Sequence, residues 1–131
     1  MATDIKAKRF TDGTAAAATT IAAAQTLGGA GNMTLAGTAA TFGGTNLGQK
    51  ITLVSTGNIS AVTFTITGTD PTGASQTEDL TGPNNSTVTS TKYFNTVTQI
   101  AASGAVGTNT SSGVAADQGG TLFAGRTRVR G

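Results

Sequence analysis

One stretch of the chain decides its fold: Ile59 to Ile100, ISAVTFTITGTDPTGASQTEDLTGPNNSTVTSTKYFNTVTQI. Its first part, Val62 to Thr67, alternates apolar and hydroxyl side chains, which is typical of a strand with one face on a core and the other in water. The turn formers Gly68 to Gly73 then interrupt the alternation. We therefore expect Ser75 to Thr81 to return antiparallel to the first strand, with Leu80 directed inward.

Short extended segments flank this hairpin on both sides. The segments that predict strands are NMTLA (32–36), TAATF (38–42), KITLVS (50–55, with Ile51 and Leu53 on one face), 87–91 and 93–100. Residues 101–120 predict one or two edge strands, or a loop that partners order. Short strands separated by turn signals every eight to twelve residues or so are typical of an all-β sandwich or small barrel. The side chains expected in its core include Phe64, Ile66, Tyr93, Phe94, Val97 and Ile100.

The composition predicts one domain with a thin core. The chain has 131 residues, of which 37% are hydrophobic but only 5% aromatic, and it has nineteen glycines and no cysteine. We expect an antiparallel β domain at 32–118, an Ala/Gly/Thr-rich N-terminal arm at 1–31 and a basic C-terminal arm at 119–131. The N-terminal arm is expected to be extended and packed on a neighbour. Small chains with little apolar surface to bury are often completed by oligomerisation, so a homo-oligomer is expected.

No residue pattern points to catalysis. The sequence has neither His nor Cys, which excludes the common nucleophile–imidazole pairs. Glu78 and Asp79 are adjacent, so a strand sends their side chains to opposite faces. Asp70 and Asp12 precede glycines without the alternating carboxylates of a calcium loop. We therefore expect no enzyme activity, no catalytic residues, no metal site and no cofactor.

The basic residues gather near the two ends of the sequence. Six of them are the candidate contact residues, Lys6, Lys8, Arg9, Arg126, Arg128 and Arg130. The alternation of the last three would place their guanidinium groups on one side of an extended segment. An acidic protein surface is favoured as their target over nucleic acid, because the terminal segments offer few aromatic side chains that could stack on a base. No stretch predicts a membrane span or a secretory signal.

Three segments resemble a group of small virion proteins of tailed bacteriophages. They are IAAAQTLGGAGNMTL (21–35), VTFTITGTD (62–70) and EDLTGPNNSTVTSTKYFNTVTQI (78–100). The proteins of this group are similar to capsid decoration, or cement, proteins. The resemblance implies a protein on the outer surface of the head, made in the host cytoplasm, which binds the major capsid protein, forms a homotrimer and stabilises contacts between capsid subunits. Residues 1–20 and 120–131 do not share the resemblance.

An alternative interpretation belongs to another class of virion protein. A tail or fibre component that binds host glycans would use a similar β architecture. Sugar sites usually present Trp or Tyr platforms, however, and this chain has no Trp and only Tyr93. An exported surface adhesin would need a signal that the sequence does not display. The decoration protein is therefore the favoured hypothesis.

Overall fold

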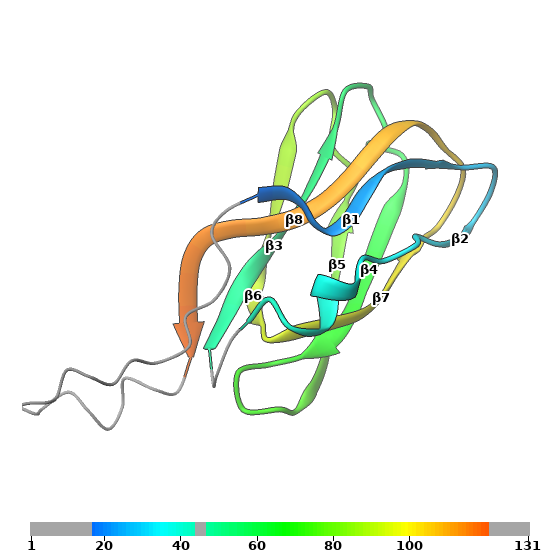
Figure 1. The fold of residues 1–131 in the computed structure, drawn as a ribbon. Coiled ribbons are helices and arrows are strands. Elements are labelled where there is room, and N and C mark those ends of the chain that lie inside the picture. The colour runs from blue at the N-terminus through cyan, green and yellow to red at the C-terminus, as the bar shows by residue number, and fades with distance from the viewer. Residues whose placement is uncertain (1–16, 44–46, 121–131) are drawn as a thin grey trace, which may run out of the picture.

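The fold is a sandwich of two antiparallel sheets (Figure 1). The computed structural model describes residues 17–43 and 47–120. The elements are β1 (Ala17–Leu27), β2 (Gly31–Asn32), the 3-10 helix η1 (Gly37–Ala40), β3 (Leu47–Ser55), β4 (Thr63–Thr69), β5 (Ser75–Thr81), β6 (Thr87–Phe94), β7 (Thr96–Ala102) and β8 (Val106–Gly120). One four-stranded sheet has the order β1-β8-β3-β6 and the other has the order β2-β7-β4-β5. The predicted all-β class and sandwich architecture are confirmed.

The hairpin of β4 and β5 forms as the alternation predicted. Its two strands pair without a register shift from Thr63–Thr81 to Thr69–Ser75. Phe64, Ile66 and Leu80 are buried, while the intervening threonines of β4 are more accessible. The period of two therefore directs one face of the hairpin into the core and leaves the hydroxyl face toward solvent.

The turn of this hairpin is organised by Asp70. Its Oδ1 accepts hydrogen bonds from the Thr72 amide (2.8 Å), the Thr72 hydroxyl (2.6 Å) and the Ala74 amide (3.0 Å). Gly73 adopts a φ of 93°, which glycine reaches without the steric cost of a Cβ atom. The Thr72 hydroxyl is the main cause of a lowered pKa for the Asp70 carboxyl, since its hydrogen bond favours the charged form. The aspartate is a structural turn residue.

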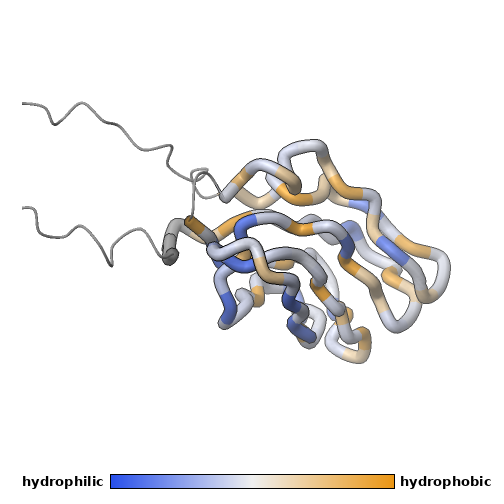
Figure 2. The backbone as a smooth tube through the Cα atoms, turned by 90° about the horizontal axis from the view of Figure 1, so that it is seen from below, coloured by the Kyte–Doolittle hydropathy of each residue, from blue (hydrophilic) through white to orange (hydrophobic). Residues whose placement is uncertain are grey.

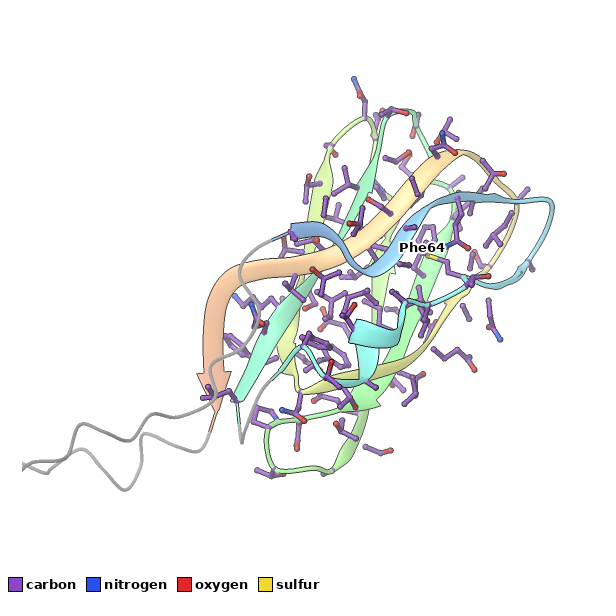
Figure 3. The ribbon with its side chains drawn as sticks, viewed as in Figure 1. Phe64 is labelled. Carbon is purple, nitrogen blue, oxygen red and sulfur yellow. The ribbon has the colours of Figure 1, made fainter. Side chains whose placement is uncertain are left out.

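The core lies between the two sheets. Phe64 lies between the layers in Figure 3, and apolar residues recur along the backbone tube in Figure 2. The largest fully buried apolar side chains are Phe42, Phe64, Phe94, Ile21, Ile51, Leu53, Ile66, Ile100, Val106 and Val114. The core predictions for Phe64, Ile66, Phe94, Val97 and Ile100 are confirmed. Tyr93 differs, because it is only half-buried, with Lys50 Nζ 5.3 Å from the centre of its ring.

The strand β8 occupies a central place, whereas the sequence predicted at most edge strands in this segment. It pairs with β1 on one side and with β3 on the other. The hydrophobic pattern did not predict this strand, because fully buried hydroxyl residues, Thr110 and Ser112, take the place of apolar residues in it. Ser112 Oγ donates to the Thr52 carbonyl oxygen (2.9 Å), which satisfies a polar group at a position that a strand usually fills with an apolar residue.

The strand β1 belongs to the sandwich, although the sequence placed these residues in an N-terminal arm packed on a neighbour. It pairs with β8 through several register shifts. At Gly113, an added Cβ atom would lie 1.8 Å from the Ala17 carbonyl oxygen. The absence of a side chain at Gly113 lets β1 cross β8 closely. The small residues of β1 therefore pack within the chain. The composition alone could not distinguish this packing from packing on a partner.

The predicted strand at 38–42 is wrong. Residues 37–40 form η1, in which the Thr41 and Phe42 amides donate to the Thr38 carbonyl oxygen at 3.1 and 3.0 Å. The two alanines of this segment have low strand propensity, and no neighbouring strand pairs with it. Phe42 is nevertheless buried and contributes to the core. In the predicted strand at 32–36, only Asn32 lies in a strand.

Candidate functional site

The two ends of the described chain belong to neighbouring strands of one sheet, β1 and β8. Ala17 pairs with Val114, which in turn pairs with Ile51 in the middle of β3. Gly120 pairs with Leu47, the first residue of β3. These positions are four residues apart along β3, or about 13 Å. The chain therefore continues toward both terminal segments from one region of the sandwich (Figure 1).

The predicted contact residues belong to these terminal segments. Lys6, Lys8 and Arg9 precede Ala17, and Arg126, Arg128 and Arg130 follow Gly120. All six lie outside the described residues, so their roles stay predictions. What the structure adds is the pair of points at which the segments join the sandwich.

The charged groups of the sandwich itself are held by local contacts. Asp79 Oδ1 accepts from the Thr65 hydroxyl (2.7 Å), and Lys92 Nζ donates to the Thr77 carbonyl oxygen (2.7 Å). These contacts hold both groups on the hairpin side of the molecule. Together with the contact of Lys50 on the Tyr93 ring, they leave the described surface with scattered charges rather than a basic patch.

The edges of the two sheets meet along β5 and β6, and side chains join them. The Glu78 carboxylate accepts from the backbone amides of Thr91 (2.8 Å) and Lys92 (2.9 Å), and Gln76 Nε2 donates to the Tyr93 carbonyl oxygen (2.6 Å). These contacts occupy backbone groups that an incoming strand would use. We call this β5–β6 contact the closed seam.

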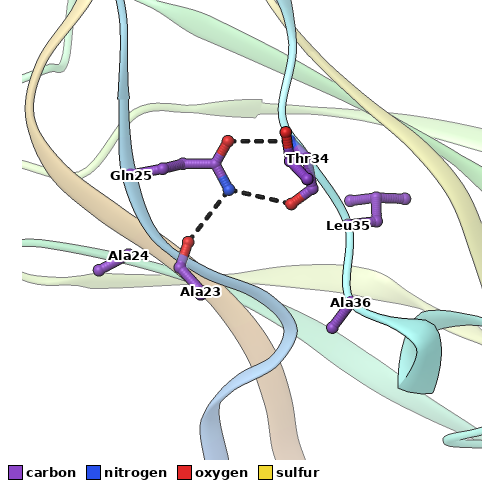
Figure 4. Close-up of a pocket in the computed structure, with 6 residues that line it drawn as sticks. All are labelled: Ala23, Ala24, Gln25, Thr34, Leu35 and Ala36. Atoms are coloured by element: carbon purple, nitrogen blue, oxygen red, sulfur yellow. Dashed lines mark hydrogen bonds between the residues drawn. The ribbon is translucent and has the colours of Figure 1, made fainter.

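A shallow apolar pocket lies on the opposite side of the sandwich, between β1 and the segment that precedes η1 (Figure 4). Its volume is about 310 Å³, and its lining residues are Ala23, Ala24, Gln25, Thr34, Leu35 and Ala36. Pockets that bind small molecules usually measure roughly 300 to 1,000 Å³, so this one is at the small end of that range. Its walls offer methyl groups and one carboxamide, which suits an apolar side chain better than a charged ligand. We call it the β1 pocket.

The carboxamide of Gln25 bridges the two walls of the β1 pocket. Oε1 accepts from the Thr34 amide (2.8 Å), and Nε2 donates to the carbonyl oxygens of Thr34 (2.9 Å) and Ala23 (3.1 Å), as Figure 4 shows. The side chain thus pairs with both backbone groups of Thr34 as a neighbouring strand would. The sequence did not predict this site. Its only signal was a single amide residue in an Ala/Thr-rich run.

The described residues contain no group of three His, Cys, Asp or Glu side chains placed to hold a metal ion. Within the same residues, no helix has the length and apolar character needed to cross a membrane. The arrangement offers surfaces for contact with other chains, namely the region where the terminal segments join and the β1 pocket.

Comparisons with protein families, with curated proteins and with solved structures find no match to this chain.

Proposed function

We propose that the protein is a decoration, or cement, protein of a tailed-phage head. In this role it binds the outer capsid surface as a homotrimer and stabilises contacts between major capsid proteins. The observation that carries the proposal is that the described chain leads into both basic terminal segments from one region of an antiparallel sandwich, at Ala17 and at Gly120. Two basic segments that start close together can bind one partner surface, while the sandwich itself remains on the outside of that surface.

The distribution of charge supports a protein partner. The described part of the chain carries Lys50 and Lys92 against Asp70, Glu78, Asp79 and Asp117, so it is slightly acidic. The six candidate contact residues give the terminal segments their basic character, and arginine matches the geometry of surface carboxylates. A trimer would present each segment three times, and linked weak contacts bind far more tightly than a single one. Such a protein would hold a shell together through many small contacts.

The glycan-binding alternative has weaker support. Tyr93 is the only tyrosine, and the chain has no tryptophan. The Tyr93 ring is half-buried and has the Lys50 ammonium group near its face. It is therefore poorly placed to serve as an open stacking platform for a sugar.

The proposal can be tested by co-sedimentation with empty heads of the same phage prepared without this protein. We expect the wild type to sediment with the heads, and less so as salt rises, because salt screens exposed charges. Arg126→Gln, Arg128→Gln and Arg130→Gln combined should weaken binding strongly. A matched control, Thr127→Ser with Val129→Thr, changes the same segment without changing its charge and should bind as the wild type does.

Two outcomes would count against the proposal. Failure of the wild type to bind heads at low salt would refute the decoration role. Equal binding by the arginine variant and its control would refute the role given to the C-terminal arginines.

A further inference from the structure

The β1 pocket lies along a sheet edge that is only partly protected. On the other side of the sandwich, the closed seam covers β5 and β6 with contacts such as those of Glu78. The free side of β1 is covered only in part, by hydrogen bonds from the Ala36 amide to the Ile21 carbonyl oxygen (2.7 Å) and from the Thr38 hydroxyl to the Thr20 carbonyl oxygen. Beyond these contacts the covering segment is held off β1 by the Gln25 carboxamide, and the pocket opens there.

The surroundings of this pocket carry no charge. The sequence has no Asp, Glu, Lys or Arg between Gly13 and Gln49, a range that includes all of β1 and every residue that lines the pocket. Proteins commonly protect exposed strand edges with charged residues or proline. The uncharged edge of β1, with its apolar pocket, is therefore suited to being covered by another segment. A segment that covers it must itself be uncharged and must carry an apolar side chain.

One stretch outside the described residues meets both conditions. The sequence TLFAG at 121–125 is uncharged and contains Leu122 and Phe123. In residues 1–12, the branched and aromatic apolar side chains, Ile5 and Phe10, each lie next to a charged residue, Lys6 or Arg9. The polarity of the pocket therefore favours the C-terminal stretch over the N-terminal one.

The stretch cannot reach the pocket of its own chain. Gly120 lies opposite Leu47, whereas the part of β8 beside the pocket, Ser112, lies opposite Leu53. These two rows are six residues apart along β3, or about 20 Å. Three residues from Gly120 to Phe123 span at most about 11 Å. A Phe123 side chain in the β1 pocket must come from a second copy.

We propose that the β1 pocket of one copy binds Phe123 of a second copy, with residues 121–125 lying along the free side of β1. The donor and acceptor surfaces differ, so the contact is heterologous, and repetition around a symmetry axis closes a ring. Gln25 acts as a positioning residue that holds the pocket wall at Thr34 in place. This inference deepens the homo-oligomer part of the proposed function and rests on it, but it does not depend on the capsid.

A disulfide cross-link tests the contact directly, because the protein has no cysteine of its own. In the full chain, Ala24→Cys combined with Ala124→Cys places one thiol in the pocket and one beside Phe123. Mild oxidation should give covalent oligomers larger than a dimer, including a closed ring. Either single-cysteine variant can give dimers at most. A disulfide needs Cα atoms within about 7 Å, so efficient cross-linking reports proximity.

Two matched variants make the test specific. Ala61→Cys with Ala124→Cys moves the first thiol to another exposed alanine and should cross-link at the background level. Phe123→Ser, added to the Ala24→Cys and Ala124→Cys pair, should slow cross-linking about tenfold or more, since it removes a large apolar side chain from the contact.

The inference is overturned if the pocket pair cross-links no faster than the Ala61 pair, or if Phe123→Ser leaves the rate unchanged. Sedimentation velocity of the unmodified protein separates two kinds of failure. If the protein is an oligomer but the specific cross-link does not form, only this inference is refuted. If the protein is a monomer at all concentrations, the homo-oligomer part of the proposed function is refuted as well. Head binding still tests the capsid part.

Discussion

Replacing Glu78 with alanine should destabilise the sandwich by opening the closed seam. The substitution removes the acceptor for the backbone amides of Thr91 and Lys92, at 2.8 and 2.9 Å, and for the Thr91 hydroxyl at 3.1 Å. A hydrogen bond to a charged group contributes about 1.5–3 kcal/mol when it is well protected. Both donor residues are exposed, so water replaces much of what is lost. We expect a loss of about 2 kcal/mol in the free energy of unfolding and roughly 6–10 °C in Tm.

Urea unfolding followed by circular dichroism measures this loss. The midpoint should fall while the slope m stays constant, which indicates lost stability without a change in the unfolding transition. Asp79→Ala is the matched control, because Asp79 is the adjacent carboxylate on the same strand but accepts its hydrogen bond from the Thr65 hydroxyl, within the hairpin, rather than from β6. Its effect should stay within about 0.5 kcal/mol. Equal effects of the two substitutions would refute the role assigned to Glu78.

The other predictions concern the core and the hairpin. Phe64→Ala should cost about 3–5 kcal/mol in chemical unfolding, because the side chain is fully buried between the sheets; a cost below 1 kcal/mol or so would contradict that placement. Gly68→Ala should cost about 1–3 kcal/mol, since its Cβ would lie 1.9 Å from a backbone oxygen of β7, whereas Gly28→Ala, with no atom within 4 Å, should unfold near the wild-type midpoint. The lowered pKa of Asp70, due first to the Thr72 hydroxyl, means that its charged form stabilises the fold above the unfolded-state pKa. That contribution is lost as pH falls through the lowered pKa, so Asp70→Asn should weaken the acid dependence of stability below about pH 4, and an unchanged acid profile would argue against it.

The hairpin was predictable because its local signals agree. Alternation in Val62 to Thr67, a turn with Asp70 and Gly73, and an inward Leu80 all favour the same two strands. The segment at 101–120 was not predictable in this way, because buried hydroxyls at Thr110 and Ser112 replace the apolar residues that mark a central strand. The Ser112 hydroxyl finds its acceptor on β3, far away in the sequence, so no local pattern predicts its burial.

The candidate site was predictable only in part. The basic residues stand out by charge, but the sequence could not say that Ala17 and Gly120 lie in neighbouring strands of one sheet, at levels only four β3 residues apart. The β1 pocket depends on Gln25 meeting Thr34 across a turn, and an isolated glutamine carries no signal of such a contact. Small residues in β1 suit an extended arm and a sheet strand equally well. Only the close crossing at Gly113 distinguishes the two.

The two sides of the sandwich are built differently, and this asymmetry links the fold to assembly. The closed seam uses charged and amide side chains, such as Glu78 and Gln76, to occupy backbone groups. The strand β1 and the residues that line the β1 pocket carry no charge. A protein with this arrangement can associate through one side while the other side resists unspecific strand pairing.

Cryo-electron microscopy of empty heads mixed with the purified protein tests the central claim most directly. Heads of the same phage prepared without the protein should show added density at regular positions on the outer surface, in groups of three. That density should weaken when residues 121–131 are deleted. Heads whose outer surface stays bare at saturating protein concentration would contradict the decoration role.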